Sequence, residues 1–573
     1  MDKKIQVSIN NQKVEVPMGS TILDAAKKAG FSIPTLCHIK KINEIGACRI
    51  CVVEVDGYNH LVTACSTPVT DGMKITTTNE KVFNARKNNL ELLLSAHNID
   101  CLSCPRSLSC ELQKLSREYN CYSQKYEGSK PEFQKDTSSL CLERDSSKCI
   151  VCKKCIAVCS EVQSVHALTA NDRGFNTVVG CAFGKDLASS TCVECGQCTV
   201  VCPTGALYEK QDQNLVLKAL SNPNLTTIVA AAPSVRVALG EEFNMPVGTN
   251  VEKQMISALR KLGFSKVFDI NFAADLTIVE ESQEFVKRYE DNKLPLFTSC
   301  CPGWINFVKK FYPELKENIS TCKSPQQMFG ATCKTYYAEK MGLNPKNIFV
   351  VTIMPCTAKK SELVRPHQNA SGYNDVDATL TTRELAILLK QQGLLLSNME
   401  DGEFDMPMGM YSGAGVIFGT TGGVMEAALR TLVEKADNKS LENPEFLLVR
   451  GEDGIKESQY SVGGKKVSVA VVSGLANARK LIQQIINKEK YFDYIEVMAC
   501  PGGCVGGGGM PRNLEVPNLF TKRANSLYES DKSNLQRSAH LNPSIKEFYD
   551  TYLGEPNGKK SHEILHTKYD WDV

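Results

Sequence analysis

Cysteine is the residue with the greatest chemical potential in this chain, because 25 of the 573 residues are cysteines and many recur at fixed spacing. Two segments, CIVCKKCIAVC and CVECGQCTVVCP, each follow the pattern C-x2-C-x2-C-x3-C. This spacing is typical of a pair of 4Fe-4S clusters in which the fourth cysteine of each run binds the other cluster. The predicted ligand sets are Cys149, Cys152, Cys155 and Cys202 for one cluster, and Cys192, Cys195, Cys198 and Cys159 for the other.

A second group of cysteines, spaced C-x10-C-x2-C-x13-C, lies near the N-terminus. Four thiolates spread in this way through a β-rich segment can enclose a 2Fe-2S cluster, although the first gap exceeds the plant-type spacing. A zinc ion with four thiolate ligands is the alternative. The iron sites predicted elsewhere favour the 2Fe-2S cluster, whose ligands are then Cys37, Cys48, Cys51 and Cys65.

A third group combines one histidine with three cysteines in the pattern H-x3-C-x2-C-x5-C. Three thiolates and one imidazole can hold either zinc or a 4Fe-4S cluster. Imidazole in place of thiolate removes one negative charge, which favours the reduced cluster and raises its reduction potential. Spacing alone fits zinc nearly as well, but the other iron sites favour a 4Fe-4S cluster. Its ligands are then His97, Cys101, Cys104 and Cys110.

The cysteine groups divide the chain into parts, and 573 residues exceed what one core supports. The predicted fold is multidomain, α+β and α/β. A hairpin at IQVSINNQKVEV and a helix from Thr21 predict an N-terminal β-grasp ferredoxin-like domain. A small helical cluster domain, a polar linker (SQKYEGSKPEFQKDTSSL), a bacterial two-cluster ferredoxin domain and a two-lobed α/β domain with mixed sheets follow. The predicted domains are residues 1–78, 79–125, 141–210 and 211–573.

Three apolar runs in the last part end in cysteine, namely KLPLFTSCC, NIFVVTIMPC and FDYIEVMAC. If each run is a buried strand, each cysteine lies at the carboxyl end of a strand. Open α/β sheets place their ligand crevice at this end. We therefore expect one site to collect cysteines from all three runs. Four clusters in series leading to this site would form a path for electrons.

Three segments of this region, TSCCPGW (298–304), MPCTAKK (354–360) and MACPGGCVGGGG (498–509), resemble the signature motifs of the FeFe hydrogenase catalytic domain. The resemblance extends over nearly the whole chain and is to the large monomeric clostridial type. It implies reversible reduction of protons to H2 by heterolytic chemistry, with electrons from ferredoxin or a similar small redox protein.

The resemblance also implies the cofactor of the catalytic site, an H-cluster made of a 4Fe-4S cubane bridged to a di-iron unit with CO, cyanide and azadithiolate. Maturation proteins would deliver the di-iron unit. Lys359 is implied to donate a charge-assisted hydrogen bond to a cyanide. The glycines of PGGCVGGGG let backbone amides approach cluster sulfurs. The implied cubane ligands are Cys301, Cys356, Cys500 and Cys504, and the last also bridges to the di-iron unit.

The adjacent thiols of Cys300 and Cys301 would make a strained disulfide. In the resembling family the first of two such cysteines binds no iron and exchanges protons with the bridging amine. Glu281 and Glu284 lie three residues apart, on one face of a predicted helix, and spacing alone indicates a solvated face. The resemblance instead implies a proton path through Glu284, Ser320, Glu281 and Cys300.

Several residues depart from the family pattern or stand outside it. Met510 occupies a position where Gln is expected, and Cys322 and Cys333 stand where Ala or Ser is more usual. Buried packing or an extra redox role is expected for the unassigned cysteines. The segment HEILH (562–566) fits the zinc-protease pattern H-E-x-x-H. It lies seven residues from the C-terminus without further ligands, so we do not predict a protease site. The unassigned cysteines are Cys121, Cys141, Cys181, Cys322 and Cys333.

Composition narrows the partners. A net charge of +2, from 66 basic and 64 acidic residues, does not favour nucleic acid or a membrane surface, and no apolar stretch is long enough to span a bilayer. We expect a cytoplasmic monomer. One alternative is the catalytic subunit of an electron-bifurcating NADH/ferredoxin hydrogenase complex. The others are a non-catalytic hydrogenase-like iron-sulfur protein and an electron-transfer subunit of the complex I type.

Overall fold

The computed structural model describes residues 3–123, 125–126 and 133–571, so part of the predicted linker lies outside the described residues. The chain forms two compact units. The first unit comprises residues 1–161, 166–190 and 201–208, and the second comprises residues 162–165, 191–200 and 209–573. The segment 191–200 thus groups with the C-terminal part, whereas the sequence analysis placed it within 141–210.

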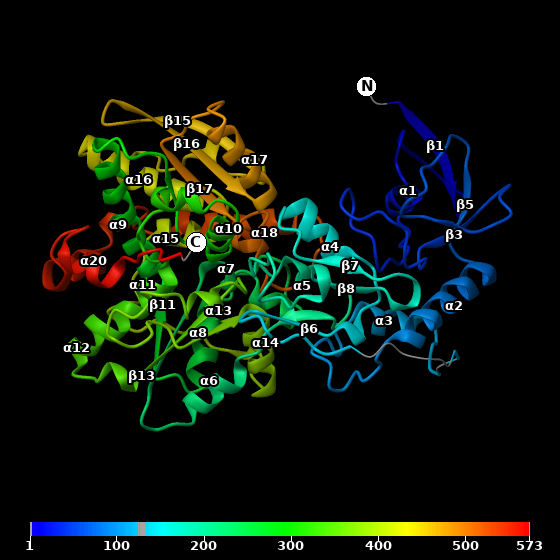
Figure 1. Ribbon diagram of the computed structural model, residues 1–573, viewed down its shortest axis with the longest axis horizontal. Helices are drawn as coiled ribbons and strands as arrows, with labels where there is room; N and C mark the ends of the chain where they lie inside the picture. The colour runs from blue at the N-terminus through cyan, green and yellow to red at the C-terminus, as the bar shows by residue number, and fades with distance from the viewer. Residues whose placement is uncertain (1–2, 124, 127–132, 572–573) are drawn as a thin grey trace. The chain divides into compact units, whose positions relative to one another are not determined.

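The N-terminal part of the first unit is a five-stranded mixed sheet in the order β2-β1-β5-β3-β4 (Figure 1). The predicted hairpin is confirmed as β1 and β2, and alternate residues of β1 face the core. Helix α1 begins after Thr21, whose side chain forms a capping box with Asp24. The elements are β1 (Lys4–Ile9), β2 (Gln12–Pro17), α1 (Ile22–Lys28), β3 (Val52–Val55), β4 (Val62–Thr63) and β5 (Lys74–Thr76).

The rest of the first unit is built from helices and short strands that hold the cysteine loops. The expected helical segment is confirmed as α2 (Glu80–Ala96) and α3 (Glu111–Glu118), which contact each other. Apolar residues of these helices pack with the cysteine loops around Cys37 and Cys152 in one small core. The remaining elements are β6 (Leu142–Arg144), α4 (Lys154–Ala157), β7 (Thr169–Asn171) and β8 (Val178–Gly180).

The second unit contains two four-stranded sheets. The first has the order β11-β10-β13-β14, and all its neighbouring strands are parallel. Its central strands are buried almost throughout, which is typical of a parallel sheet with both faces covered. The strands are β10 (Thr226–Ala231), β11 (Lys266–Asp269), β13 (Ile348–Met354) and β14 (Ala378–Thr381).

The second sheet has the order β12-β17-β16-β15, with β15 antiparallel and the others parallel. The prediction of mixed sheets therefore holds for this sheet only. In the first sheet all neighbouring strands are parallel, because they are joined by crossover connections and none by a hairpin. The strands are β12 (Leu296–Phe297), β15 (Ile455–Val462), β16 (Lys465–Ser473) and β17 (Tyr494–Met498).

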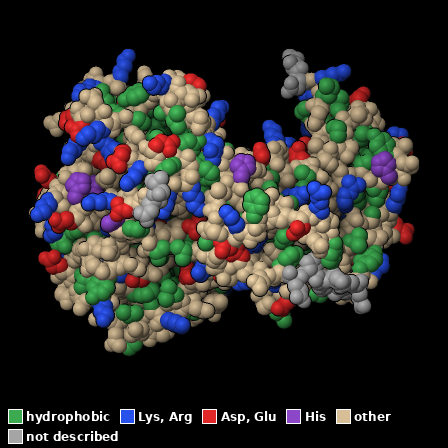
Figure 2. All heavy atoms as spheres, in the orientation of Figure 1, with side chains coloured by type: hydrophobic (Ala, Val, Ile, Leu, Met, Phe, Trp, Pro, Cys, Tyr) green, Lys and Arg blue, Asp and Glu red, His purple; other side chains and the backbone are tan. Residues whose placement is uncertain are grey.

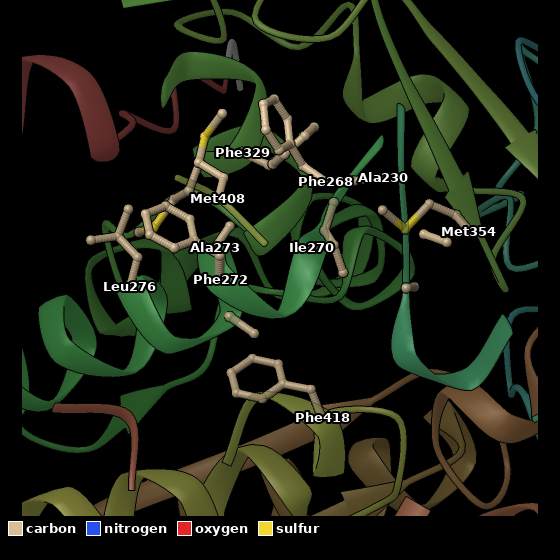
Figure 3. Packing of buried hydrophobic residues seen from close by; sticks show 14 of the residues in the cluster. Ala230, Phe268, Ile270, Phe272, Ala273, Leu276, Phe329, Met354, Met408 and Phe418 are labelled. Carbon is tan, nitrogen blue, oxygen red and sulfur yellow. The ribbon is translucent and has the colours of Figure 1, made fainter. Parts of the chain in front are cut away.

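Helices cover both sheets and carry the residues of the site. Helix α9 (Ile270–Glu290) contacts α11, α15 and α16, and most of its residues are buried. Figure 3 shows part of the surrounding core, where the rings of Phe268 and Phe329 pack 6.3 Å apart between centroids. The other helices of the unit that matter below are α8 (Glu252–Lys261), α10 (Pro302–Phe311), α11 (Pro325–Thr332), α13 (Lys359–Glu362), α14 (Thr382–Gln391), α15 (Gly413–Ile417), α16 (Gly423–Asp437), α17 (Leu475–Ile486), α18 (Leu519–Ser533), α19 (Pro543–Phe548) and α20 (Lys559–Leu565).

On the face shown in Figure 2, basic and acidic side chains are interspersed. This distribution matches the nearly balanced composition of 66 basic and 64 acidic residues. Among the described residues, no helix is both long and apolar enough to cross a membrane.

Candidate metal-cluster and proton-transfer site

The cysteines at the three strand ends come together in the second unit. Cys301 follows β12 and precedes α10, Cys356 follows β13, and Cys500 and Cys504 follow β17. Burial raises the pKa of the Cys356 thiol well above its usual value, and repulsion from the other three thiols raises it further. Burial likewise raises the pKa of Cys500 to about 12, with Cys301 adding to the rise. The four sulfurs therefore lie within electrostatic reach of one another, and they come from two different sheets.

The glycine run after Cys504 lies directly on neighbouring backbone. A Cβ at Gly507 would lie 2.2 Å from the carbonyl oxygen of Pro355, and one at Gly508 would lie 2.3 Å from that of Cys195. Real side chains do not tolerate such contacts, so only glycine allows the loop to lie on the strand end that carries Cys356. The loop is a close-fitting cradle, and a flexible linker does not describe it.

The residues present fit an iron-sulfur group. All four cysteines are free of disulfide bonds, and thiolate is the ligand that iron-sulfur clusters use. Four thiolates also suit zinc. The surroundings favour the larger group, because the predicted cluster motif with Cys195 touches the same loop, and burial followed by repulsion from Cys198 and Cys500 raises the pKa of Cys195.

Lys359 lies beside the four cysteines at the start of α13. Its ammonium group donates to Ser324 Oγ at 2.7 Å and to Glu362 Oε2 at 2.8 Å. Its positive charge opposes the rise in the pKa of Cys356 and of Cys504, which burial causes. Lys359 is thus a buried, oriented cation near the thiols, and its hydrogen bond to a cyanide stays a prediction.

The two predicted glutamates lie on α9, and both are buried, so they do not form a solvated face. Ser320 Oγ donates to Glu284 Oε2 at 2.7 Å. The Ser320 hydroxyl also lies close enough to Glu281 to lower the pKa of that carboxyl, and the Arg288 guanidinium donates to Glu284 at 2.9 Å. The structure therefore brings Glu284, Ser320 and Glu281 of the predicted path close together, and it adds Arg288, which was not predicted, as a hydrogen-bond partner of Glu284.

The pKa values of Glu281 and Cys300, at the end of the path nearest the four cysteines, are raised. Burial raises the pKa of Glu281 to about 7; a hydrogen bond from Tyr494 opposes the rise, and the negative charge of Glu284 adds to it. Burial also raises the pKa of the Cys300 thiol well above its usual value, and the charge of Glu281 adds to this rise. Near neutral pH, Glu281 can both release and accept a proton, which suits a relay.

Tyr494 contacts the predicted proton path, and the sequence analysis did not single it out. It is fully buried on β17, and its hydroxyl donates to Glu281 Oε1. Tyr494 begins the strand that leads into MACPGG, and this position was the only hint in the sequence that it lies near the site. A single tyrosine in an apolar run forms no pattern that predicts such a role.

The motif with Cys192, Cys195 and Cys198 adjoins the same glycine loop in the second unit. Gln197 Nε2 donates to the carbonyl oxygen of Gly506 at 2.8 Å, and Thr199 Oγ1 donates to that of Gly508 at 3.2 Å. These contacts explain why residues 191–200 group with the C-terminal part. The predicted fourth ligand of this cluster, Cys159, belongs to the first unit, and its participation stays a prediction.

The first unit gathers two of its predicted ligand sets clearly. Cys51 Sγ lies 3.3 Å from Cys65 Sγ, and the neighbouring thiol of Cys37 lowers the pKa of Cys48 to about 6. The two thiol pairs interact electrostatically. A separate cavity is lined by all four cysteines of the first crossed set, namely Cys149, Cys152, Cys155 and Cys202.

The histidine-containing set lies beside that cavity. A Cβ at Gly205 would lie 2.4 Å from Cys104 Sγ, so the thiol packs on the backbone just after Cys202. Burial raises the pKa of Cys110, and Cys104 adds to the rise. His97 is buried at the end of α2.

Two cysteine loops of the first unit contact the same crossed ligand set, whereas the sequence analysis expected the clusters in series. Asn43 Nδ2 donates to the carbonyl oxygen of Cys37 at 2.6 Å and to that of Cys152 at 3.0 Å. The 2Fe-2S candidate loop and the histidine-containing loop thus both contact the set that contains Cys152 and Cys202. The spacing of cysteines along the chain does not predict which loops contact each other.

The remaining sequence candidates differ in burial. The expected burial is confirmed for Cys141, Cys181, Cys322 and Cys333, whereas Cys121 is partly exposed. Met510 is buried, and its carbonyl oxygen accepts from Arg383 Nη1.

Comparison with protein families gives the class of the chain. Residues 225–508 match the family "Iron only hydrogenase large subunit, C-terminal domain", and residues 517–571 match "Iron hydrogenase small subunit". Residues 2–80 match a 2Fe-2S iron-sulfur cluster binding domain, and residues 148–206 match a 4Fe-4S dicluster domain. Residues 86–125 match the NADH-ubiquinone oxidoreductase-G iron-sulfur binding region.

Individual relatives extend over nearly the whole chain. NADP-reducing hydrogenase subunit HndD of Solidesulfovibrio fructosivorans is 45% identical over 577 residues, which cover 99% of this chain and 98% of that protein. Iron hydrogenase 1 of Clostridium pasteurianum is 43% identical over 575 residues, covering 98% and 99%. A solved structure of apo HydA1, an FeFe-hydrogenase from Chlamydomonas reinhardtii, is 42% identical with a TM-score of 0.58, covering 63% of this chain and 99% of that one. The chain belongs to the FeFe hydrogenase family, and the resemblance of its three motifs is confirmed.

Proposed function

We propose that this protein catalyses the reversible reduction of protons to H2 with electrons from reduced ferredoxin or a similar small redox protein. The observation that carries the proposal is the meeting of four cysteines from two sheets beside a buried chain of proton-carrying side chains. The cubane of an H-cluster would be held by Cys301, Cys356, Cys500 and Cys504. When bound, the H-cluster supplies the two-electron heterolytic chemistry of H2.

The chain's own residues supply protons and electrostatic order. Arg288 and Ser320 hold the Glu284 carboxylate by hydrogen bonds at 2.9 and 2.7 Å, so that Ser320 can pass a proton between Glu284 and Glu281. Glu281 would exchange that proton with Cys300, whose neutral thiol is favoured by burial. Lys359 faces the site with its charge fixed by Glu362, ready to donate to an anionic ligand.

Electrons would reach this site from the N-terminal cysteine sets. The proposed cofactors are one 2Fe-2S cluster and three accessory 4Fe-4S clusters, with the ligands named from the sequence. Asn43 and the packing of Cys104 on Gly205 support two inlets that meet at the set containing Cys152 and Cys202. The motif around Cys195, which contacts the glycine loop, would carry electrons onward.

Infrared spectroscopy of protein produced with maturation proteins tests the proposal. Metal-bound CO and cyanide absorb where protein does not, so these bands, together with H2 evolution from reduced ferredoxin, are expected. Absence of both in protein with a full iron content would contradict it and would favour the non-catalytic alternative.

A second candidate function is the catalytic subunit of a complex that uses a nicotinamide cofactor. The relative that favours it is the NADP-reducing hydrogenase subunit HndD, because the match with this chain covers 98% of that protein. Copurification with flavoprotein subunits, and H2 evolution that needs NADPH or NADH together with ferredoxin, would support this candidate. Turnover by the isolated chain with ferredoxin alone would support the first.

A further inference from the structure

Three potential metal ligands of different chemistry meet outside the cysteine sites. One ligand atom each of Glu284, Cys322 and His566 lies within 4.8 Å of the other two, and all three residues are buried. Carboxylate, thiolate and imidazole are the three ligand types that zinc uses in proteins. None of the cluster motifs includes Cys322 or His566.

The backbone fixes this arrangement. Cys322 and His566 face each other in an isolated antiparallel bridge, held by Lys323 N donating to Leu565 O at 2.8 Å and Thr567 N donating to Thr321 O at 2.8 Å. Glu284 reaches the pair from α9, and Cys322 Sγ lies 3.7 Å from Glu284 Oε2. The end of HEILH is thus held against the proton path.

The partners of His566 orient its ring for coordination. Nε2 lies 3.1 Å from Glu280 Oε2, while Nδ1 lies 2.8 Å from Thr321 Oγ1. When one ring nitrogen donates its N–H to a carboxylate, the other ring nitrogen keeps its lone pair. This hydrogen bond commonly fixes the tautomer and the orientation of a metal-binding histidine. The free lone pair is then on Nδ1, beside Thr321, whose backbone N–H donates to Glu284 at 3.1 Å. The Thr321 hydroxyl can rotate away when a metal arrives.

We propose that Glu284, Cys322 and His566 Nδ1 bind one zinc ion, and that the bound ion stops proton transfer through Glu284. The second half rests on the proposed function. Binding releases the thiol proton of Cys322 to solvent, forms the zinc–sulfur bond and leaves water as a fourth ligand, with no change in oxidation state. A zinc-bound Glu284 carboxylate no longer offers the oxygen that accepts from Ser320.

The surface connection runs through a second histidine. His562 is exposed, and its ring lies 4.1 Å from that of His566 between centroids. The two imidazoles therefore lead from solvent to the buried donors. Cys322 is the distinctive part of the site, because the family pattern leads us to expect Ala or Ser at this position.

Zinc binding itself can be measured without activity. Cluster-loaded protein is incubated with zinc, passed through gel filtration and analysed for zinc per chain and by zinc K-edge absorption. The expected result is one zinc more per chain than in Cys322→Ala, with one sulfur neighbour near 2.3 Å and nitrogen or oxygen neighbours near 2.0–2.1 Å. Equal zinc in both proteins, or a spectrum without sulfur, would overturn the site.

Blockage is tested by zinc titration of H2 evolution, with each protein compared with its own zinc-free rate. Cys322→Ala and His566→Gln are expected to need at least tenfold more zinc for half-inhibition than the wild type. Cys333→Ala removes another buried thiol and should behave as the wild type. Zinc that binds through sulfur without slowing turnover would overturn the blockage. Absence of H2 evolution before zinc is added would refute the proposed function and the blockage, while the zinc count still decides the site.

Discussion

Ser320 Oγ donates to Glu284 Oε2 at 2.7 Å, and the same hydroxyl lowers the pKa of Glu281, which lies one helical turn from Glu284. One small side chain therefore lies between two buried carboxylates. A hydroxyl can donate to one carboxylate while it accepts from the protonated form of the other, so a proton can pass by a change in the direction of two hydrogen bonds.

Substitution Ser320→Ala is expected to lower H2 evolution about ten- to hundredfold, because it removes the hydroxyl that donates to Glu284 and lies near Glu281. Infrared bands of the H-cluster should be unchanged. The matched control is Ser282→Ala on α9, the helix that carries both glutamates, since the Ser282 hydroxyl is buried without a hydrogen-bond partner among the described residues. Equal rates in the two variants would remove Ser320 from the path.

Substitution Tyr494→Phe is expected to shift the pH dependence of turnover. Burial raises the pKa of Glu281 to about 7, and the phenolic hydroxyl opposes that rise by stabilising the ionised carboxylate. Loss of the hydroxyl should therefore raise the pKa further, by about one unit, and move the inflection near pH 7 upward. Tyr549→Phe, which removes the hydroxyl that donates to Glu280, serves as control. A profile that stays in place or moves downward would contradict the assignment.

Substitution Cys300→Ser should preserve the infrared bands of the H-cluster and lose most turnover. The thiol is within electrostatic reach of Glu281 and of the predicted iron ligands Cys301 and Cys504, so it lies near both the carboxylate and the cluster site. A serine hydroxyl has a similar size but a higher pKa, so it releases a proton less readily. Cys333→Ala is the control for loss of a buried thiol. Unchanged turnover in Cys300→Ser would mean that protons reach the site by another route.

Substitution Asn43→Leu should slow electron transfer from the 2Fe-2S site and leave its ligands in place. The side chain joins the carbonyl oxygens of Cys37 and Cys152, and Leu has a similar volume without the hydrogen bonds. Freeze-quench electron paramagnetic resonance after mixing with a reductant would follow each cluster. Asn171→Leu, which loses a bond to the carbonyl oxygen of Cys181, is the control. Identical kinetics in both variants would show that Asn43 carries no part of this route.

Local patterns predicted much of the fold and of the site. The hairpin β1–β2 follows from alternation, and the strands that precede Cys356 and Cys500 follow from apolar runs of strand length. Cysteine spacing was informative for a physical reason: several ligands of one metal group must come from a short segment, so the spacing is fixed by the group and not by the rest of the fold.

Contacts between distant segments could not be predicted in this way. Tyr494 is separated from Glu281 by most of the catalytic region, and His566 reaches Glu280 only because the C-terminal segment pairs with residues 321–323. The burial of Glu284 was also hidden, since a carboxylate three residues from another is ordinarily solvated. These relationships depend on tertiary packing, for which a single sequence carries no periodic signal.

The two-sheet origin of the central cysteines has a consequence for synthesis. Cys301 is translated long before Cys504, and the ligand set is incomplete until the loop after β17 has left the ribosome and docked. A premature stop anywhere before that loop leaves isolated thiols and no binding site, however well the earlier modules have folded. Assembly of the catalytic centre is therefore a late event, which can occur only after translation has passed Cys504.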